Sequence, residues 1–204
     1  MCNLINLRMK KFVSRFFVLS LLLVTVSCVE SNNKQKEQEE KTADVEVNTP
    51  QDIHSVLEAV GSIGDGTSMN VLELVKENGD TLDIVTTDAK IFGGLECGQK
   101  VDVFYNNFED ESGASMIINL SVLQNTWVLD GNPNAGFTIV EDGVVDTYNM
   151  KDRNYNHWRI DMGALLMSSD YSGTLKVDTF HLQTLSDDSL VISGGNSVLK
   201  MVRR

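Results

Sequence analysis

The sequence has only three cysteines in 204 residues, too few for the multiple disulfides that hold small secreted domains together. It is also short of basic residues, with 17 Lys and Arg against 29 Asp and Glu and a formal net charge of −12. Binding to a nucleic acid requires clustered Lys and Arg side chains that displace counterions from phosphates. The charge balance therefore argues against nucleic acid as a partner.

Signatures of catalysis and metal binding are also missing from the sequence. His54, His157 and His181 are far apart in the chain, and there is no Cys-x-x-Cys pair, so the spacing typical of a zinc site is absent. No Gly-x-Ser-x-Gly turn and no glycine-rich phosphate loop occurs. The acidic clusters lack the alternating oxygen ligands of a calcium loop. We therefore expect no enzyme activity, no metal and no cofactor.

Long apolar runs are absent except at the N-terminus, where Phe16–Val24 is apolar apart from one serine. This run is too short for a transmembrane helix, which needs about 20 apolar residues. Four basic residues and no acidic residue accompany it within residues 1–27, as in the signal peptide of an exported protein. Either Met1 or Met9 starts a signal of this type.

The signal ends in Thr25-Val26-Ser27-Cys28, which resembles the bacterial lipobox. That resemblance implies removal of residues 1–27 and attachment of a lipid to Cys28. Residues 28–51 are dense in Glu, Lys, Gln and Asn, and a segment of this composition buries too little apolar surface to fold by itself. We expect these residues to form a disordered tether between the lipid anchor and a folded body that starts at residue 52.

The folded body has the sequence pattern of an all-β protein. Short apolar or alternating runs are separated by turn-forming residues, and no helical period of ten residues or more occurs. Residues 52–124 contain five such runs, which fit a small barrel. One pair surrounds Asn78-Gly79, a sequence that favours a tight type I′ hairpin turn. The predicted strands are 55–63, 71–76, 81–86, 100–105 and 116–122.

Residues 125–204 contain eight runs at a spacing of about 8–12 residues, which predicts an antiparallel meander. An eight-stranded up-and-down barrel would leave no exposed sheet edge. The predicted strands are 126–129, 136–140, 144–148, 157–162, 165–169, 175–182, 189–192 and 198–202.

Four segments carry a resemblance to a known family: Thr126-Trp127, "GFTIVEDGVVDTYN" at 136–149, "HWRIDMGALLM" at 157–167 and "LQTLSDDSLVI" at 182–192. Together they resemble the lipocalin-like lipoproteins of Bacteroidales-type bacteria. The preceding segment around "GLECGQKVDVFYN" is similar to the small OB-like barrel module of some members. The resemblance implies a five-stranded OB-like barrel followed by an eight-stranded lipocalin-like barrel, and a location in the cell envelope, at the outer membrane.

The interior of the second barrel is the expected functional site. An eight-stranded barrel is just wide enough either to be filled by side chains or to hold one small ligand. In the ligand-binding interpretation, a small apolar or amphipathic molecule contacts Trp127, Phe137, Tyr148 and Trp158. In the alternative, the interior is solid and the chain is a structural or protein-interaction lipoprotein of the envelope. The membrane, through the lipid on Cys28, is the expected partner in both cases.

Overall fold

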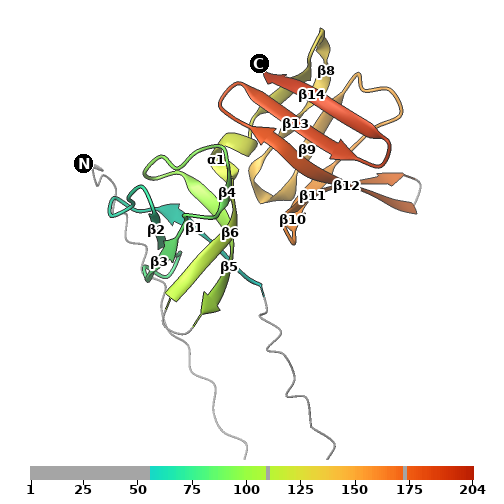
Figure 1. Cartoon of the computed structure of the whole chain (residues 1–204). Coiled ribbons are helices and arrows are strands. Elements are labelled where there is room, and N and C mark those ends of the chain that lie inside the picture. The colour runs from blue at the N-terminus through green and yellow to red at the C-terminus, as the bar shows by residue number, and fades with distance from the viewer. Residues whose placement is uncertain (1–55, 109–110, 172–173) are drawn as a thin grey trace, which may run out of the picture. The chain divides into compact units, whose positions relative to one another are not determined.

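The computed structural model describes residues 56–108, 111–171 and 174–204. The predicted signal peptide, the lipid-attachment residue Cys28 and the tether lie outside these residues. Ile53–Arg204 group as a single unit, built almost entirely of β-strands (Figure 1). Among the described residues no helix is long and apolar enough to cross a membrane.

The first sheet contains strands β1–β6 (Figure 1). Their order is β3-β2-β1-β5-β6-β4, and a parallel contact between Val85 of β3 and Gly113 of β6 closes five of them into a small mixed barrel. The predicted five-stranded barrel is therefore confirmed. The strands are β1 (Leu57–Ile63), β2 (Val71–Val75), β3 (Thr81–Val85), β4 (Lys90–Phe92), β5 (Lys100–Phe108) and β6 (Glu111–Asn119).

The hairpin predicted at Asn78-Gly79 joins β2 to β3, but its turn type differs from the prediction. Gly79 has φ +88°, whereas Asn78 is not among the residues with positive φ. The Gly79 N–H donates to Lys76 O at 2.9 Å, and the Lys76 N–H donates to Asp80 O at 2.8 Å. This pattern is that of a type I turn followed by a glycine bulge, which needs only one left-handed residue.

The predicted strand 116–122 is wrong in its last part, because Leu120–Leu123 form the short helix α1. Asn119 caps this helix, accepting a hydrogen bond from the Val122 N–H at 3.1 Å. Its amide nitrogen also donates to Gly93 O at 3.2 Å and Gly94 O at 3.1 Å. The buried Asn119 thus holds the end of β6 against the segment after β4, a strand that the sequence pattern did not predict.

The second sheet has eight antiparallel strands in the order β10-β11-β12-β13-β14-β7-β8-β9. Its two edges, β9 and β10, meet through a bridge between Val144 and His157, so the sheet forms a nearly closed barrel, as predicted. The strands are β7 (Thr126–Leu129), β8 (Asn132–Ile139), β9 (Val145–Tyr148), β10 (His157–Asp161), β11 (Ala164–Tyr171), β12 (Thr174–Leu185), β13 (Ser189–Gly194) and β14 (Ser197–Arg203), with the 3₁₀ turn η1 (Glu141–Gly143) before β9.

Two hydrophobic cores hold the sheets. One, around Leu72, Leu74 and Ile84, fills the first barrel. The other fills the second barrel and also includes Phe104 and Ile118 from the outer face of the first. A backbone hydrogen bond from the Gly93 N–H to Leu185 O, at 3.0 Å, links the two sheets. Because apolar surface of both sheets is buried in one core, we expect the two barrels to stabilise each other.

Candidate functional site

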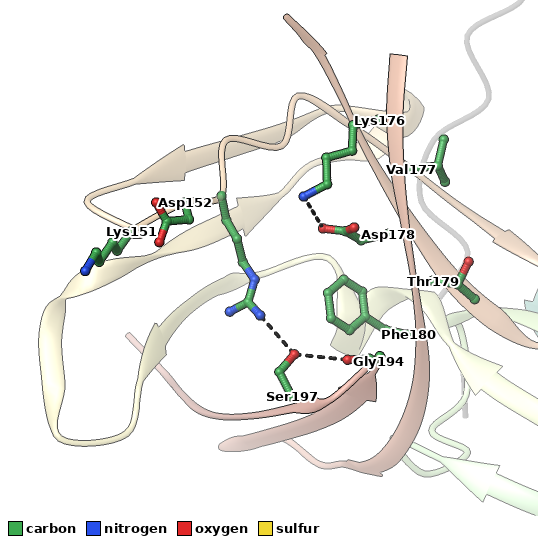
Figure 2. A pocket seen from close by; sticks show the side chains of 11 residues that line it. Lys151, Asp152, Lys176, Val177, Asp178, Thr179, Phe180, Gly194 and Ser197 are labelled. Atoms are coloured by element: carbon green, nitrogen blue, oxygen red, sulfur yellow. Dashed lines mark hydrogen bonds and ion pairs between the residues drawn. The ribbon is translucent and has the colours of Figure 1, made fainter. Parts of the chain in front are cut away.

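A cavity with a volume of about 700 Å³ lies in the C-terminal barrel (Figure 2). This volume is within the range typical of small-molecule sites. Its walls come from the segment between β9 and β10, from β12 and from the β13–β14 turn. The lining residues are Lys151, Asp152, Arg153, Lys176, Val177, Asp178, Thr179, Phe180, Gly194, Gly195 and Ser197.

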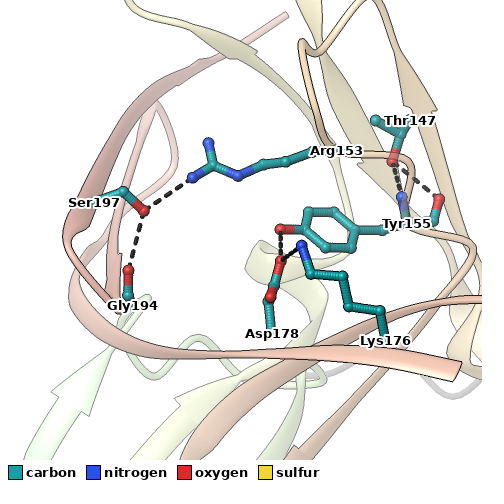
Figure 3. Close-up of polar contacts among 7 residues, drawn as sticks. All are labelled: Thr147, Arg153, Tyr155, Lys176, Asp178, Gly194 and Ser197. Atoms are coloured by element: carbon teal, nitrogen blue, oxygen red, sulfur yellow. Dashed lines mark hydrogen bonds and ion pairs between the residues drawn. The ribbon is translucent and has the colours of Figure 1, made fainter.

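A polar network built on Asp178 lies in this cavity (Figure 3). The Tyr155 hydroxyl donates to Asp178 Oδ2 at 2.7 Å, and Lys176 Nζ lies 3.6 Å from the same oxygen. Burial raises the pKa of Tyr155, and the hydrogen bond to Asp178 raises it further. Tyr155 therefore stays a neutral hydrogen-bond donor, and Asp178 is already partnered on the protein side.

Arg153 is held differently. Its Nη2 donates to Ser197 Oγ at 2.9 Å, and Ser197 Oγ donates in turn to Gly194 O at 3.0 Å (Figure 3). A guanidinium group carries five N–H donors in a planar fork that matches a carboxylate or phosphate. The contact with Ser197 orients the half-buried Arg153 and leaves further donors for a ligand.

The apolar wall of the cavity is Phe180, which is 1% exposed. The Tyr155 ring packs edge-on against it, with ring centroids 6.1 Å apart and an interplanar angle of 86°. Gly194 must be a glycine here, because a Cβ atom would lie 2.3 Å from Thr179 O and 2.8 Å from Phe180 Cδ1. The close approach of β13 to β12 therefore fixes the position of this wall.

Comparison with known proteins concerns the same part of the chain. Residues 123–202 match the family model described as lipocalin-like. The C-terminal half carries a lipocalin-like domain. One similar solved structure is that of a lipocalin-like protein from Bacteroides thetaiotaomicron VPI-5482, with 23% sequence identity and a TM-score of 0.34 over 40% of this chain and 96% of that chain. No curated protein matches the chain.

Two of the predicted site residues lie in the core of the lipocalin-like domain. Trp127 on β7 and Phe137 on β8 are cross-strand partners, and both are 0% exposed. The Trp127 Nε1–H donates to Leu123 O at 2.9 Å. The structure brings these two residues together, but it packs them in the hydrophobic core, and neither lines the 700 Å³ cavity.

The other two predicted residues lie elsewhere in the lipocalin-like domain. Tyr148 on β9 is half-buried, and its buried hydroxyl has no hydrogen-bond partner within the described part of the chain. Trp158 on β10 is also half-buried, and its Nε1–H donates to Val140 O at 2.7 Å. Neither residue lines the 700 Å³ cavity. A ligand-binding role for these four aromatic residues stays a prediction.

Sequence reasoning missed the residues that line the cavity. Arg153 follows the turn-like Lys151-Asp152 and lies outside any strand, so no alternation places it. Lys176 and Asp178 alternate with the apolar Val177 along the strand. In such an alternation the charged residues are expected to point to solvent and the apolar residue to the core, so the pattern does not place Lys176 and Asp178 in a cavity. The signal available in the sequence is local charge: Lys151, Arg153 and Lys176 are three of only 17 basic residues in an acidic chain.

Other chemistry is sparse in the part of the chain that the structure describes. Within these residues no group of three or more His, Cys, Asp or Glu side chains is placed to hold a metal ion.

Proposed function

We propose that the chain is a lipid-anchored protein of the bacterial envelope whose lipocalin-like domain binds a small amphipathic molecule with an anionic head group. The observation that carries this proposal is the half-buried Arg153 guanidinium, held by Ser197 at the wall of the 700 Å³ cavity. Arg153 positions the head group, and the part of the cavity beside Phe180 receives the apolar part.

The charge of the cavity supports an anionic head group. Lys151, Arg153 and Lys176 line it together with Asp152 and Asp178, which makes the site positive in a chain whose net charge is −12. Asp178 already accepts from Tyr155 and pairs with Lys176. A carboxylate ligand can therefore accept hydrogen bonds from the N–H groups of Arg153 that do not contact Ser197. A charge-assisted pair with arginine is among the stronger polar contacts.

The packing supports a ligand in this cavity and not at the centre of the barrel. The largest fully buried side chains include Trp127, Phe137 and Phe180, and interiors packed in this way have few voids larger than a water molecule. We therefore place the ligand in the cavity beside Arg153, with its charged end at the guanidinium group.

Paired probes test the ligand class. We expect dodecanoate to bind, measured by titration calorimetry on the chain secreted with residues 1–28 replaced by a signal lacking the lipobox cysteine. Arg153→Gln should weaken dodecanoate binding about ten- to a hundredfold, since a hydrogen bond to a charged group contributes about 1.5–3 kcal/mol. Arg203→Gln, which alters an exposed arginine that does not line the cavity, is the matched control.

Dodecanol provides the second arm of the test. It has the same chain length without the charge, so its binding should be weaker than that of dodecanoate and unchanged by Arg153→Gln. Equal binding of dodecanoate to wild-type and Arg153→Gln protein would contradict the proposed head-group site.

Membrane attachment is a separate part of the proposal and rests on the lipobox-like segment Thr25–Cys28. Mass spectrometry of the protein purified from membranes should find the chain starting at Cys28, with a diacylglycerol thioether on its sulfur. The expected location is the outer membrane. A Cys28 found unmodified or in a disulfide would contradict this part and leave the ligand site untouched.

The filled interior favours one alternative function, a solid protein-interaction lipoprotein that binds no small molecule. The burial of Trp127 and Phe137 supports it directly. Under this alternative, dodecanoate and dodecanol both fail to bind, and partners contact the loops and outer faces of the barrels.

A further inference from the structure

A second cavity, of about 360 Å³, shares no residue with the Arg153 site. It is lined by β1, β5 and α1 and by η1 and β10 of the lipocalin-like domain. Four acidic side chains and two basic ones reach it. These are Glu58, Asp102, Glu141 and Asp142 against Lys100 and Arg159.

Both basic residues are paired with carboxylates other than Asp102. Lys100 Nζ lies 3.4 Å from Glu141 Oε1, and Arg159 Nη2 lies 2.9 Å from Asp161 Oδ2. Among the residues that the structure describes, neither Glu58 nor Asp102 has a basic partner within 4.0 Å. The cavity thus keeps carboxylates without a positive counterpart.

Asp102 is the decisive residue because it is buried. It lies on β5 between Val101 and Val103, which face the core of the first barrel, so its side chain is on the opposite face. It is only 3% exposed, and its Oδ1 has no hydrogen-bond partner among the residues that the structure describes. A buried acceptor without a donor is costly, and a ligand that brings an N–H group into the cavity would satisfy it.

Trp158 adds an aromatic wall. Its Nε1–H donates to Val140 O at 2.7 Å, which anchors the half-buried indole at the cavity. A cation near the face of a tryptophan ring is attracted by the ring's quadrupole. Val60, Leu120 and Ile160 supply apolar surface beside it, which suits a short alkyl chain.

We propose that this cavity binds a small organic cation, an ammonium or guanidinium compound, with Asp102 and Glu58 accepting its hydrogen bonds and Trp158 lining its alkyl chain. An organic cation fits better than a metal ion. Across the described parts of the chain no three His, Cys, Asp or Glu side chains lie close enough together to coordinate a metal, whereas an amine needs only one or two carboxylates and an apolar wall.

The site should depend on pH. Burial and the neighbouring Glu58 raise the pKa of Asp102 to about 7. An ammonium ligand requires the ionised carboxylate, so affinity should fall about tenfold between pH 8 and pH 6, in proportion to the ionised fraction. The charged groups facing Asp102 are Glu58 on β1, Lys100 on β5, Glu141 and Asp142 on η1, and Arg159 on β10.

Calorimetric titration with n-butylammonium tests the proposal on the full-length protein in a non-ionic detergent. At pH 8 we expect saturable binding that Asp102→Asn weakens at least tenfold. Glu58→Gln should weaken butylammonium binding as well. Because Glu58 is exposed, this variant tests the site even if Asp102→Asn fails to fold. Asp83→Asn is the matched control, because Asp83 is an exposed carboxylate on β3 outside the cavity.

Three results would overturn the proposal. Butylammonium that binds equally to wild type, Asp102→Asn and Glu58→Gln does not use this cavity. Binding of neutral n-butanol with the same affinity would show an apolar site without charge recognition. Displacement of butylammonium by equimolar Ca²⁺ would show a metal site. None of these results bears on dodecanoate binding at Arg153.

Discussion

Replacing Asp102 by asparagine should stabilise the protein above neutral pH, although it alters a buried polar residue. Asp102 is 3% exposed with an unpartnered Oδ1, and its pKa is raised from 3.8 to about 7, mainly by burial. Because the folded state holds the proton more tightly than the unfolded state, Asp102 favours folding fully at pH values below 3.8. That contribution is lost progressively as the pH rises to about 7.

The size of the effect follows from the same two values. One pKa unit corresponds to about 1.36 kcal/mol, so ionising Asp102 in the folded state costs about 4 kcal/mol of unfolding free energy above pH 7. The asparagine side chain is isosteric with the protonated acid and never ionises. The difference in unfolding free energy between Asp102→Asn and wild type should therefore be near zero at about pH 4 and grow to about 4 kcal/mol at about pH 8.

Urea denaturation of both proteins across this pH range measures the difference in their unfolding free energies. The other titrating groups are the same in both proteins, so their contributions cancel in this difference. Asp83→Asn, at an exposed position of β3, controls for the loss of one negative charge and should change stability by less than about 0.5 kcal/mol. Parallel stability curves for wild type and Asp102→Asn would refute the claim that burial raises the pKa of Asp102.

Three further predictions concern packing and backbone. Trp127→Ala should lower the unfolding free energy by about 3–5 kcal/mol in urea denaturation, because Trp127 is fully buried; a loss below about 1 kcal/mol would contradict a filled interior. Gly136→Ala should lower the melting temperature sharply, since its Cβ would lie 2.0 Å from Trp127 O, whereas Gly113→Ala, with no atom within 4 Å, is the control. Met162→Gly should raise stability by about 1 kcal/mol in the same assay, because Met162 has φ +48° and is 87% exposed; an unchanged or lower value would show that its side chain stabilises the hairpin.

Much of the fold could be predicted because it depends on local patterns. All eight strands of the lipocalin-like domain lie where alternation and turn residues place them. The helix Leu120–Leu123 was missed because Leu120, Val122 and Leu123 continue an apolar run, and only the capping contact of Asn119 distinguishes the helix from a strand. Strand β4 was missed because three residues carry too little pattern.

The candidate sites were harder to predict, for a physical reason. Aromatic residues such as Trp127 stand out in a sequence, yet their large apolar surface makes them the first to be buried in a core. Arg153 contributes to a cavity only because the β13–β14 turn brings Ser197 to it from 44 positions away. Asp102 is unusual only because its outward-facing position on β5 is covered by other parts of the fold. Such long-range contacts leave no periodic mark in the sequence.

Native mass spectrometry of protein purified from a bacterial host tests most directly the proposal that the lipocalin-like domain binds an anionic amphipathic molecule at Arg153. We predict a reproducible small-molecule adduct on wild-type and Arg203→Gln protein that is lost from Arg153→Gln, and that organic extraction identifies as an acid with an apolar chain. An adduct retained by Arg153→Gln, or wild-type protein free of any adduct under gentle ionisation, would contradict the claim.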